Sequence, residues 1–329
     1  MLTDIVNEQV QTDTVAVIVV NDLVDMNLIQ KVDPRCQLKL LHRRPRSKSL
    51  LPWIKLNSFL FVFNPDIIHF HLEGLRRMVF HPAPKVFTIH NMHTSGVEYP
   101  RYNALYSISD GVNLFTSKQG FKSTTVWNGI DTNAIKKKEH KPYVPGRICS
   151  MVCVGRLYTP HKGQDLLIQA LSIIKKQGIQ DFHLDIIGEG ESRGQIESLI
   201  AQDNLQDKVA LLGQQPREYI YENLHKYDLF VLPSRSEGFG LSVAEAMCAR
   251  IPVLVCDQEG VMDVINDGAL GLSFKTGDAE KLAEGIGNFI RDGEDETITN
   301  LAYKYVIEKF NIRQTAQRYK EEYNKVINQ

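Results

Sequence analysis

The sequence predicts an α/β protein built from two doubly wound parallel-sheet domains. Its 329 residues are too many for one ordinary core and suit two domains. Short apolar runs without alternation, such as residues 229–232, recur along the chain and are typical of parallel strands buried on both faces. These runs are separated by glycine turns and helical segments, as in residues 232–256, where a strand end, a turn, a helix and a strand follow one another.

Composition and charge indicate the class of protein. Hydrophobic residues make up 43% and charged residues 23% of the chain, as in a globular protein. Residues 1–142 hold 18 Lys/Arg and 12 Asp/Glu, whereas the remainder holds 20 and 27. This asymmetry supports two domains with different partners. We expect no nucleic-acid partner.

The cysteines and the absence of targeting signals favour a cytoplasmic location. Five cysteines lie mostly in apolar segments without the spacing of a metal site, and so predict buried thiols in a reducing compartment. The sequence shows no signal peptide and no apolar run close to the length of a membrane span.

The first half begins with helical spacing over residues 1–10 and continues with a buried strand at 14–20, a helix near 21–32 and a strand at 37–41. A basic cluster at 42–48 then precedes an apolar-rich segment at 50–63. We favour a solvated loop followed by a core helix here. The alternative is peripheral contact of residues 42–55 with an anionic membrane.

Two predicted strands, 66–71 and 85–90, end in histidines, and the sequence places four histidines at these ends: His69, His71, His90 and His93. A metal site is one interpretation. However, no carboxylate or thiolate set accompanies them with ligand spacing, so we expect no metal. Residues 115–117 and 125–131 close the first domain, with an Asn-Gly turn at 128–129, and the charged, proline-punctuated stretch 136–145 predicts the linker.

The second half predicts strands at 148–154, 182–187, 209–212, 229–232 and 252–256. Helices are expected at about 164–176 and 241–249, and helical patterns cover 278–291 and 297–329.

The turn at 233–240 has the chemistry of a diphosphate site. Gly238 and Gly240 remove side chains that would block the approach of a diphosphate to backbone N–H groups. The helix that begins at Leu241 presents unpaired amides and the positive end of its dipole. Two carboxylates, Glu237 and Glu245, flank this site and suit sugar or ribose hydroxyls. The residues therefore predict a nucleotide-sugar ligand.

The string around these glutamates, EGFGLSVAEA, has seven residues between Glu237 and Glu245. It resembles the E-x7-E signature of the family-4 (group 1) retaining glycosyltransferases of the bacterial surface-polysaccharide type. That family has the GT-B fold, in which two Rossmann-like domains face each other across a cleft. Solvated glutamates on an ordinary strand–turn–helix unit are the alternative for the two acids alone. The whole string favours the glycosyltransferase interpretation.

The resemblance implies roles for the two domains. Residues 1–142, completed by the C-terminal helix 312–329, would bind the acceptor, and residues 143–311 would bind the donor. Glu237 and His90 would be the catalytic residues, and the stretch 88–91 matches the family's T-x-H-D with asparagine in place of aspartate. A packed or capping histidine is the alternative for His90. His71 is a weaker candidate for the acceptor.

The donor side follows from the same resemblance. Arg156 and Lys162 match the pair that contacts the donor phosphates, Glu245 would hold ribose hydroxyls, and no metal would be required. The expected donor-binding residues are Gly155, Arg156, Lys162, Gly188, Glu189, Gly238, Phe239, Gly240, Leu241 and Glu245. The implied reaction is retaining transfer of a hexose to a hydroxyl of a polysaccharide, such as a capsule, or of a lipid-linked oligosaccharide. A UDP-sugar is the favoured donor, and GDP-mannose is the second candidate.

One departure from the family keeps other functions open. Family members begin with a strand and a glycine-rich loop before the helix that residues 1–10 resemble, and we expect both to be missing here. A catalytically impaired donor-binding or scaffold protein is therefore the alternative function. A nucleotide-sugar isomerase of GT-B fold is disfavoured, because the E-x7-E string, Arg156 and Lys162 together belong to transferases.

Overall fold

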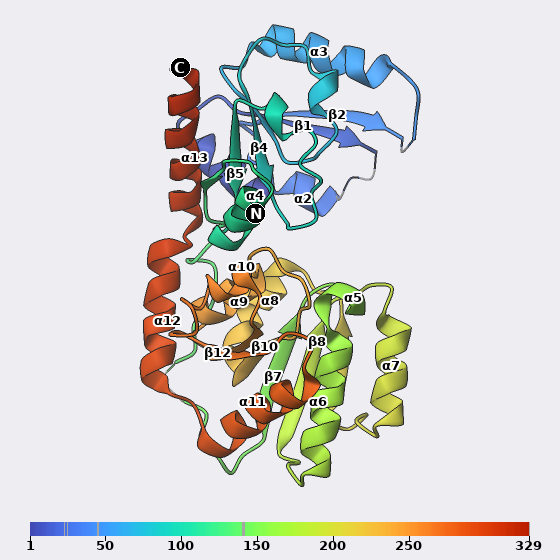
Figure 1. The fold of residues 1–329 in the computed structure, drawn as a ribbon, viewed down its shortest axis with the longest axis vertical. Coiled ribbons are helices and arrows are strands. Elements are labelled where there is room, and N and C mark those ends of the chain that lie inside the picture. The colour runs from blue at the N-terminus through green and yellow to red at the C-terminus, as the bar shows by residue number, and fades with distance from the viewer. Residues whose placement is uncertain (23, 25, 45, 140–141, 329) are drawn as a thin grey trace. The chain divides into compact units, whose positions relative to one another are not determined.

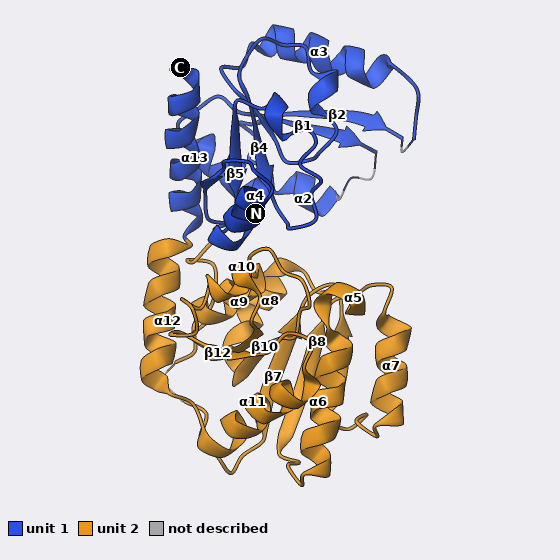
Figure 2. Ribbon diagram, in the orientation of Figure 1, with its two compact units in different colours: residues 1–130, 311–329 blue, residues 131–310 orange. Residues whose placement is uncertain are grey.

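The chain folds into two compact units in the computed structural model, which describes residues 1–22, 24, 26–44, 46–139 and 142–328. Unit 1 comprises residues 1–130 and 311–329, and unit 2 comprises residues 131–310 (Figures 1 and 2). Every strand pairing within a sheet is parallel. The prediction of an α/β protein with two parallel-sheet domains is confirmed.

Unit 2 contains one six-stranded sheet with the order β12-β11-β10-β7-β8-β9. Its strands are β7 (Cys149–Val154), β8 (Phe182–Ile187), β9 (Val209–Gly213), β10 (Leu229–Leu232), β11 (Val253–Cys256) and β12 (Leu272–Phe274). Every residue of β10 and β11 is buried, as the apolar runs predict. The strand order reverses between β7 and β10, and open sheets of this kind bind ligands at the carboxyl ends of strands at such a point.

Helices cover both faces of this sheet, because right-handed crossovers in opposite directions place them on opposite sides. Helix α6 packs against both α7 and α11, and α9 packs against α12 (Figure 1). The helices are α5 (Thr159–Lys162), α6 (Gln164–Lys176), α7 (Arg193–Gln202), α8 (Arg217–Asn223), α9 (Leu241–Cys248), α10 (Glu259–Met262), α11 (Ala279–Asp292) and α12 (Glu296–Lys309).

Unit 1 has two separate parallel sheets, β1-β2 and β3-β4-β5-β6. The strands are β1 (Ala16–Asn21), β2 (Gln37–Arg43), β3 (Ile68–Phe70), β4 (Lys85–Ile89), β5 (Ala104–Ser107) and β6 (Thr124–Thr125). The sequence predicts one sheet for this domain, but within the described residues no ladder joins β1 to β3. Strand β1 is also less buried than predicted, with only Val20 fully buried, because a two-stranded sheet is covered less completely.

The helices of unit 1 are α1 (Leu2–Gln9), α2 (Met26–Gln30), α3 (Leu51–Phe63), α4 (Asp110–Lys118) and α13 (Ile312–Ile327). Helix α13 packs on α1, and its side chains complete a core that contains Ile5, Val86, Tyr106 and Tyr319. The segment 115–117 lies within α4.

The boundary of unit 1 lies at 130–131, before the predicted position of 142. Residues that follow it are bonded to unit 2. The amide of Lys136 donates to the Tyr221 carbonyl, and that of Lys138 donates to the Ala249 carbonyl. Part of the predicted linker, residues 140–141, is outside the described residues.

All five cysteines are buried and free, as predicted. Burial raises the pKa of Cys149, Cys153, Cys248 and Cys256 to about 12. In the part of the chain that the structure describes, no helix combines the length and apolarity needed to cross a bilayer.

Candidate functional site

The two donor motifs of the sequence meet at the switch point of unit 2. Strand β7 leads into Gly155 and Arg156, and β10 leads into the turn at 233–240. Gly163, between α5 and α6, has a φ of +64°, and a Cβ atom there would lie 2.0 Å from the Pro233 carbonyl oxygen. Segments far apart in the sequence are therefore in direct backbone contact.

An ion pair joins the two motifs. Nζ of Lys162 lies 2.5 Å from Oε2 of Glu237, and the two side chains are 30% and 18% exposed. The sequence predicts contacts with the donor phosphates for Lys162 and contacts with sugar hydroxyls for Glu237. Their pairing explains how a carboxylate is accommodated beside a phosphate site, because the ammonium group compensates its charge.

Helix α9 begins next to this ion pair. Its N-cap residue, Gly240, has a φ of +89°, and no side chain caps the helix at this end. Phe239 is buried and packs edge-on against Phe310, with ring centroids 5.1 Å apart. The packing of Phe239 against Phe310 thus holds the turn in place at the switch point.

The structure places the other predicted donor residues around the same strand ends. Nη2 of Arg156 lies 2.6 Å from Oε1 of Glu191 at the surface. Gly188 follows β8, and a Cβ atom there would lie 2.0 Å from the Gly155 carbonyl oxygen. Glu189, which follows it, forms an ion pair with Arg193 at the start of α7.

Glu245 belongs to a chain of polar side chains that no motif in the sequence indicates. The Tyr221 hydroxyl on α8 donates to Oε1 of Glu245 at 3.2 Å and accepts from Nε of Arg217 at 2.7 Å. Burial and the Glu245 charge raise the pKa of Tyr221. The tyrosine therefore stays protonated and holds Glu245 in position.

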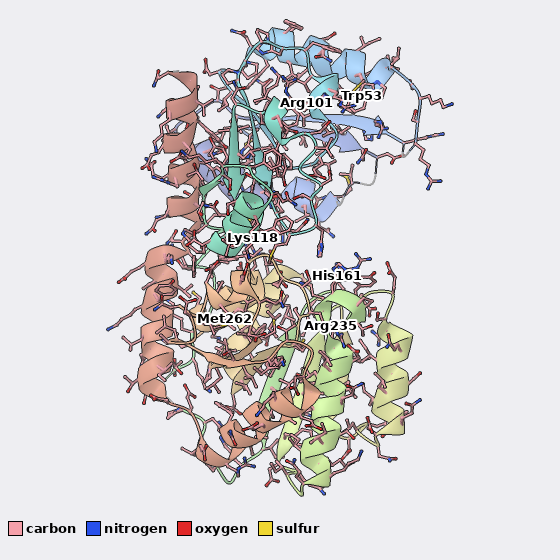
Figure 3. All side chains as sticks on the ribbon, viewed as in Figure 1. Trp53, Arg101, Lys118, His161, Arg235 and Met262 are labelled. Atoms are coloured by element: carbon pink, nitrogen blue, oxygen red, sulfur yellow. The ribbon has the colours of Figure 1, made fainter. Side chains whose placement is uncertain are left out.

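A second missed contact fixes the turn itself. Arg235 forms a bidentate pair with Asp165 of α6, with distances of 2.7 and 2.8 Å. The Arg235 amide also donates to the carbonyl of His161 in α5 at 2.7 Å, and both residues are labelled in Figure 3. The Oγ atom of Ser234 and Oε1 of Gln164 are buried here and have no hydrogen-bond partner within the described part of the chain.

Three of the strand-end histidines form a half-buried cluster in unit 1. Nδ1 of His71 lies 3.0 Å from Nε2 of His90. His69 stacks near His71, with ring centroids 4.1 Å apart, and its two nitrogens bond Tyr323 and Thr88. Burial lowers the pKa of His71 to about 3 and that of His90 to about 4.

We predict that acid destabilises the protein through this cluster. In the unfolded chain the imidazoles of His71 and His90 titrate near their ordinary pKa of about 6.5. Above this pH they are neutral in both the folded and the unfolded chain. Between that pH and about 4 the unfolded chain binds protons that the folded chain does not. The free energy of unfolding should therefore decrease as the pH is lowered from about 6.5 to about 4, by at most about 1.4 kcal/mol per pH unit for each histidine.

Denaturant unfolding at pH 7, 6 and 5 measures this slope, and the variant His71→Gln should reduce it. NMR titration of the imidazoles identifies each group directly. A midpoint near 6.5 for His90 would contradict the prediction.

Comparison with known proteins identifies the family. A family model described as "Glycosyl transferases group 1" matches residues 136–304, about half of the 329 residues. The chain therefore belongs to this family, and its fold is GT-B.

Two named relatives differ in how much of this chain they match. The amylovoran biosynthesis glycosyltransferase AmsK of Erwinia amylovora is 37% identical in an alignment 145 residues long, which covers 42% of this chain and 34% of AmsK. A Campylobacter jejuni protein is 25% identical in an alignment 314 residues long, which covers 84% of this chain and 82% of that protein. It is named N-acetylgalactosamine-N,N'-diacetylbacillosaminyl-diphospho-undecaprenol 4-alpha-N-acetylgalactosaminyltransferase.

The structure of Anabaena Alr3699/HepE in complex with UDP and glucose superimposes with a TM-score of 0.80 at 19% identity, and covers 98% of this chain and 94% of that one. Several of the most similar curated relatives are matched over about a third to a half of their own length.

Proposed function

We propose that the protein is a retaining hexosyltransferase that uses a nucleotide-sugar donor, with UDP-sugar as the first candidate. The observation that supports this most directly is the ion pair of Lys162 and Glu237 at the switch point of unit 2, beside the start of α9. A cation for phosphate, a carboxylate for hydroxyls and an uncapped helix start are the groups that a nucleoside diphosphate sugar needs.

The leaving group gains charge as the glycosidic bond breaks, and fixed positive charge stabilises it. In this proposal Lys162 and Arg156 bind the diphosphate together with the backbone of residues 238–241. Arg156 would exchange its surface partner Glu191 for phosphate, which costs little because exposed ion pairs contribute at most about 1 kcal/mol. These groups neutralise the charge without a metal ion.

The carboxylates bind hydroxyls. Glu237 would accept hydrogen bonds from the hexose and orient it, and Glu245, held by Tyr221, would bind the ribose. In the proposed reaction the bond from the anomeric carbon to the diphosphate oxygen breaks. The acceptor oxygen bonds to the same face of that carbon, and its proton passes to the leaving phosphate oxygen.

His90 is proposed to contact the hexose, and unit 1 is proposed to bind the acceptor. Nδ1 of the half-buried His71 is hydrogen-bonded to His90, and we therefore propose that His71 orients His90, with acceptor binding as its alternative role. Neutral imidazoles suit this task, because they offer one donor and one acceptor and add no charge beside the sugar.

The acceptor is proposed to be a hydroxyl of a surface polysaccharide or of a lipid-linked saccharide. Relatives whose names refer to amylovoran biosynthesis and to a diphospho-undecaprenol substrate support this class. The free, buried cysteines are consistent with a reducing compartment, and we propose a cytoplasmic location.

Calorimetry with UDP, GDP and ADP, followed by donor-sugar hydrolysis, tests the proposal. We expect UDP to bind, slow hydrolysis of the UDP-sugar to occur in the presence of EDTA, and both hydrolysis and transfer to be lost in Glu237→Ala. Nucleotide binding without any turnover would favour the scaffold alternative. Failure of all three nucleotides to bind would overturn the assignment of unit 2.

A further inference from the structure

Helix α3 presents an apolar face to solvent on the outside of unit 1 (Figure 1). Its inner face is buried through Pro52, Leu56 and Leu60. Six large apolar side chains on the outer face and beside it are between 56% and 86% exposed: Leu50, Leu51, Ile54, Phe61, Val62 and Phe80. Exposed apolar residues gathered in one place mark an interaction site.

This face is held in place by specific contacts. The Asn57 side chain donates to the Met78 carbonyl at 2.9 Å and accepts from the Phe80 amide at 2.8 Å, which ties Phe80 to the helix. The guanidinium of Arg43 in β2 lies 5.3 Å from the centre of the Trp53 ring, labelled in Figure 3. Specific contacts therefore hold these exposed apolar residues in place, and together they form one surface.

The stretch of chain between Asp33 and Asp66, which carries all of these apolar residues except Phe80, is basic. Residues 34–65 contain seven Lys/Arg and no Asp/Glu. Four of these basic residues are exposed and find no acidic partner among the described residues: Arg44, Arg46, Lys48 and Lys55. We call these four and the six apolar residues together the α3 surface. Residue 45 of this stretch is outside the described residues.

We propose that the α3 surface docks on an anionic lipid membrane. Apolar side chains on one helix face enter the boundary between headgroups and acyl chains, and neighbouring lysines and arginines bind anionic headgroups. A second copy of the chain fits less well. A symmetric dimer through the same patch would bring two basic clusters together, with like charges opposed.

The expected loss of membrane binding follows from the number of basic residues replaced. Each Lys or Arg near an anionic surface is worth about 1 kcal/mol, which is roughly fivefold in binding. Replacing three of them should therefore weaken binding by about 100-fold. Salt should weaken it as well, because the electrostatic part is screened within about a Debye length.

Flotation with vesicles of phosphatidylglycerol and phosphatidylcholine, compared with phosphatidylcholine alone, tests the proposal on the full chain at low and high salt. One variant replaces Arg44, Arg46 and Lys48 with serine, and a second carries Ile54→Ser and Phe61→Ser. Matched controls in unit 2 replace the exposed Lys176, Lys281 and Arg291, or the exposed Ile148 and Leu301, with serine. Thermal unfolding shows that each variant folds.

We expect binding to anionic vesicles alone, with about 100-fold loss in the basic variant, at least tenfold loss in the apolar variant and no change in the controls. Absence of binding, or equal losses in the controls, would overturn the proposal. So would a dimer by light scattering that the apolar variant converts to a monomer without any binding to vesicles. None of these outcomes depends on nucleotide binding, so they leave the proposed transferase activity to its own test.

Discussion

Replacing Lys162 with methionine is expected to lower the rate of sugar transfer by about 10²–10³-fold, the cost of removing one preorganised group that stabilises charge in a transition state. Methionine keeps most of the length and apolar volume of the side chain but removes its charge. Glu237, 2.5 Å away, then loses its compensating cation and repels the diphosphate. Both ground-state binding of UDP and the chemical step should suffer.

A double-mutant cycle separates these two effects. Adding Glu237→Gln to Lys162→Met removes the repulsion, so UDP affinity measured by calorimetry should recover in part while transfer stays low. Lys281→Met is the matched control, since Lys281 is exposed on α11, where its ammonium group forms an ion pair with Glu284 on the same helix. Full activity in Lys162→Met would show that the ion pair is structural and that other groups bind the phosphates.

Much of unit 2 could be predicted from the sequence because its signals are local. The run at 229–232 has no alternation and becomes β10 with every residue buried, and the helix expected from Leu241 begins there. Lys162 and Glu237 could be found by motif, and the fold brings them into contact. Apolar periodicity and glycine spacing are properties of short segments, so they are visible without the fold.

The contacts that hold the site were not predictable in the same way. The Arg235–Asp165 pair and the link from Arg217 through Tyr221 to Glu245 each join segments that are distant in the sequence. Exposed and paired acids look alike in a sequence, because only packing decides which partner a charge meets. Helix α4 is different: Ser109 accepts from the Val112 amide as its N-cap, so the string Ser109-Asp110-Gly111 carried a local start signal that could have located it.

The largest loss of stability is expected for Gly163→Ala. Gly163 ends α5 and caps α6 with a φ of +64°, a conformation that costs a residue with a Cβ atom about 1–2 kcal/mol. The new Cβ atom would also lie 2.0 Å from the Pro233 carbonyl oxygen and 2.9 Å from its carbon. Both are backbone atoms next to the buried strand β10, so they cannot move away as a flexible side chain would.

We therefore expect unit 2 to lose about 3–5 kcal/mol, the range of severe single substitutions, and its melting temperature to fall by roughly 10 °C. Gly194→Ala is the control, because a Cβ atom at this position in α7 meets no other atom within 4 Å and alanine favours a helix. That variant should be as stable as the parent or slightly more so. If Gly163→Ala melted with the parent and still bound UDP, the contact between α5 and the Pro233 turn would have to be adjustable. The close approach of the two motifs would then reflect loose packing, and the placement of Lys162 beside Glu237 would need another cause.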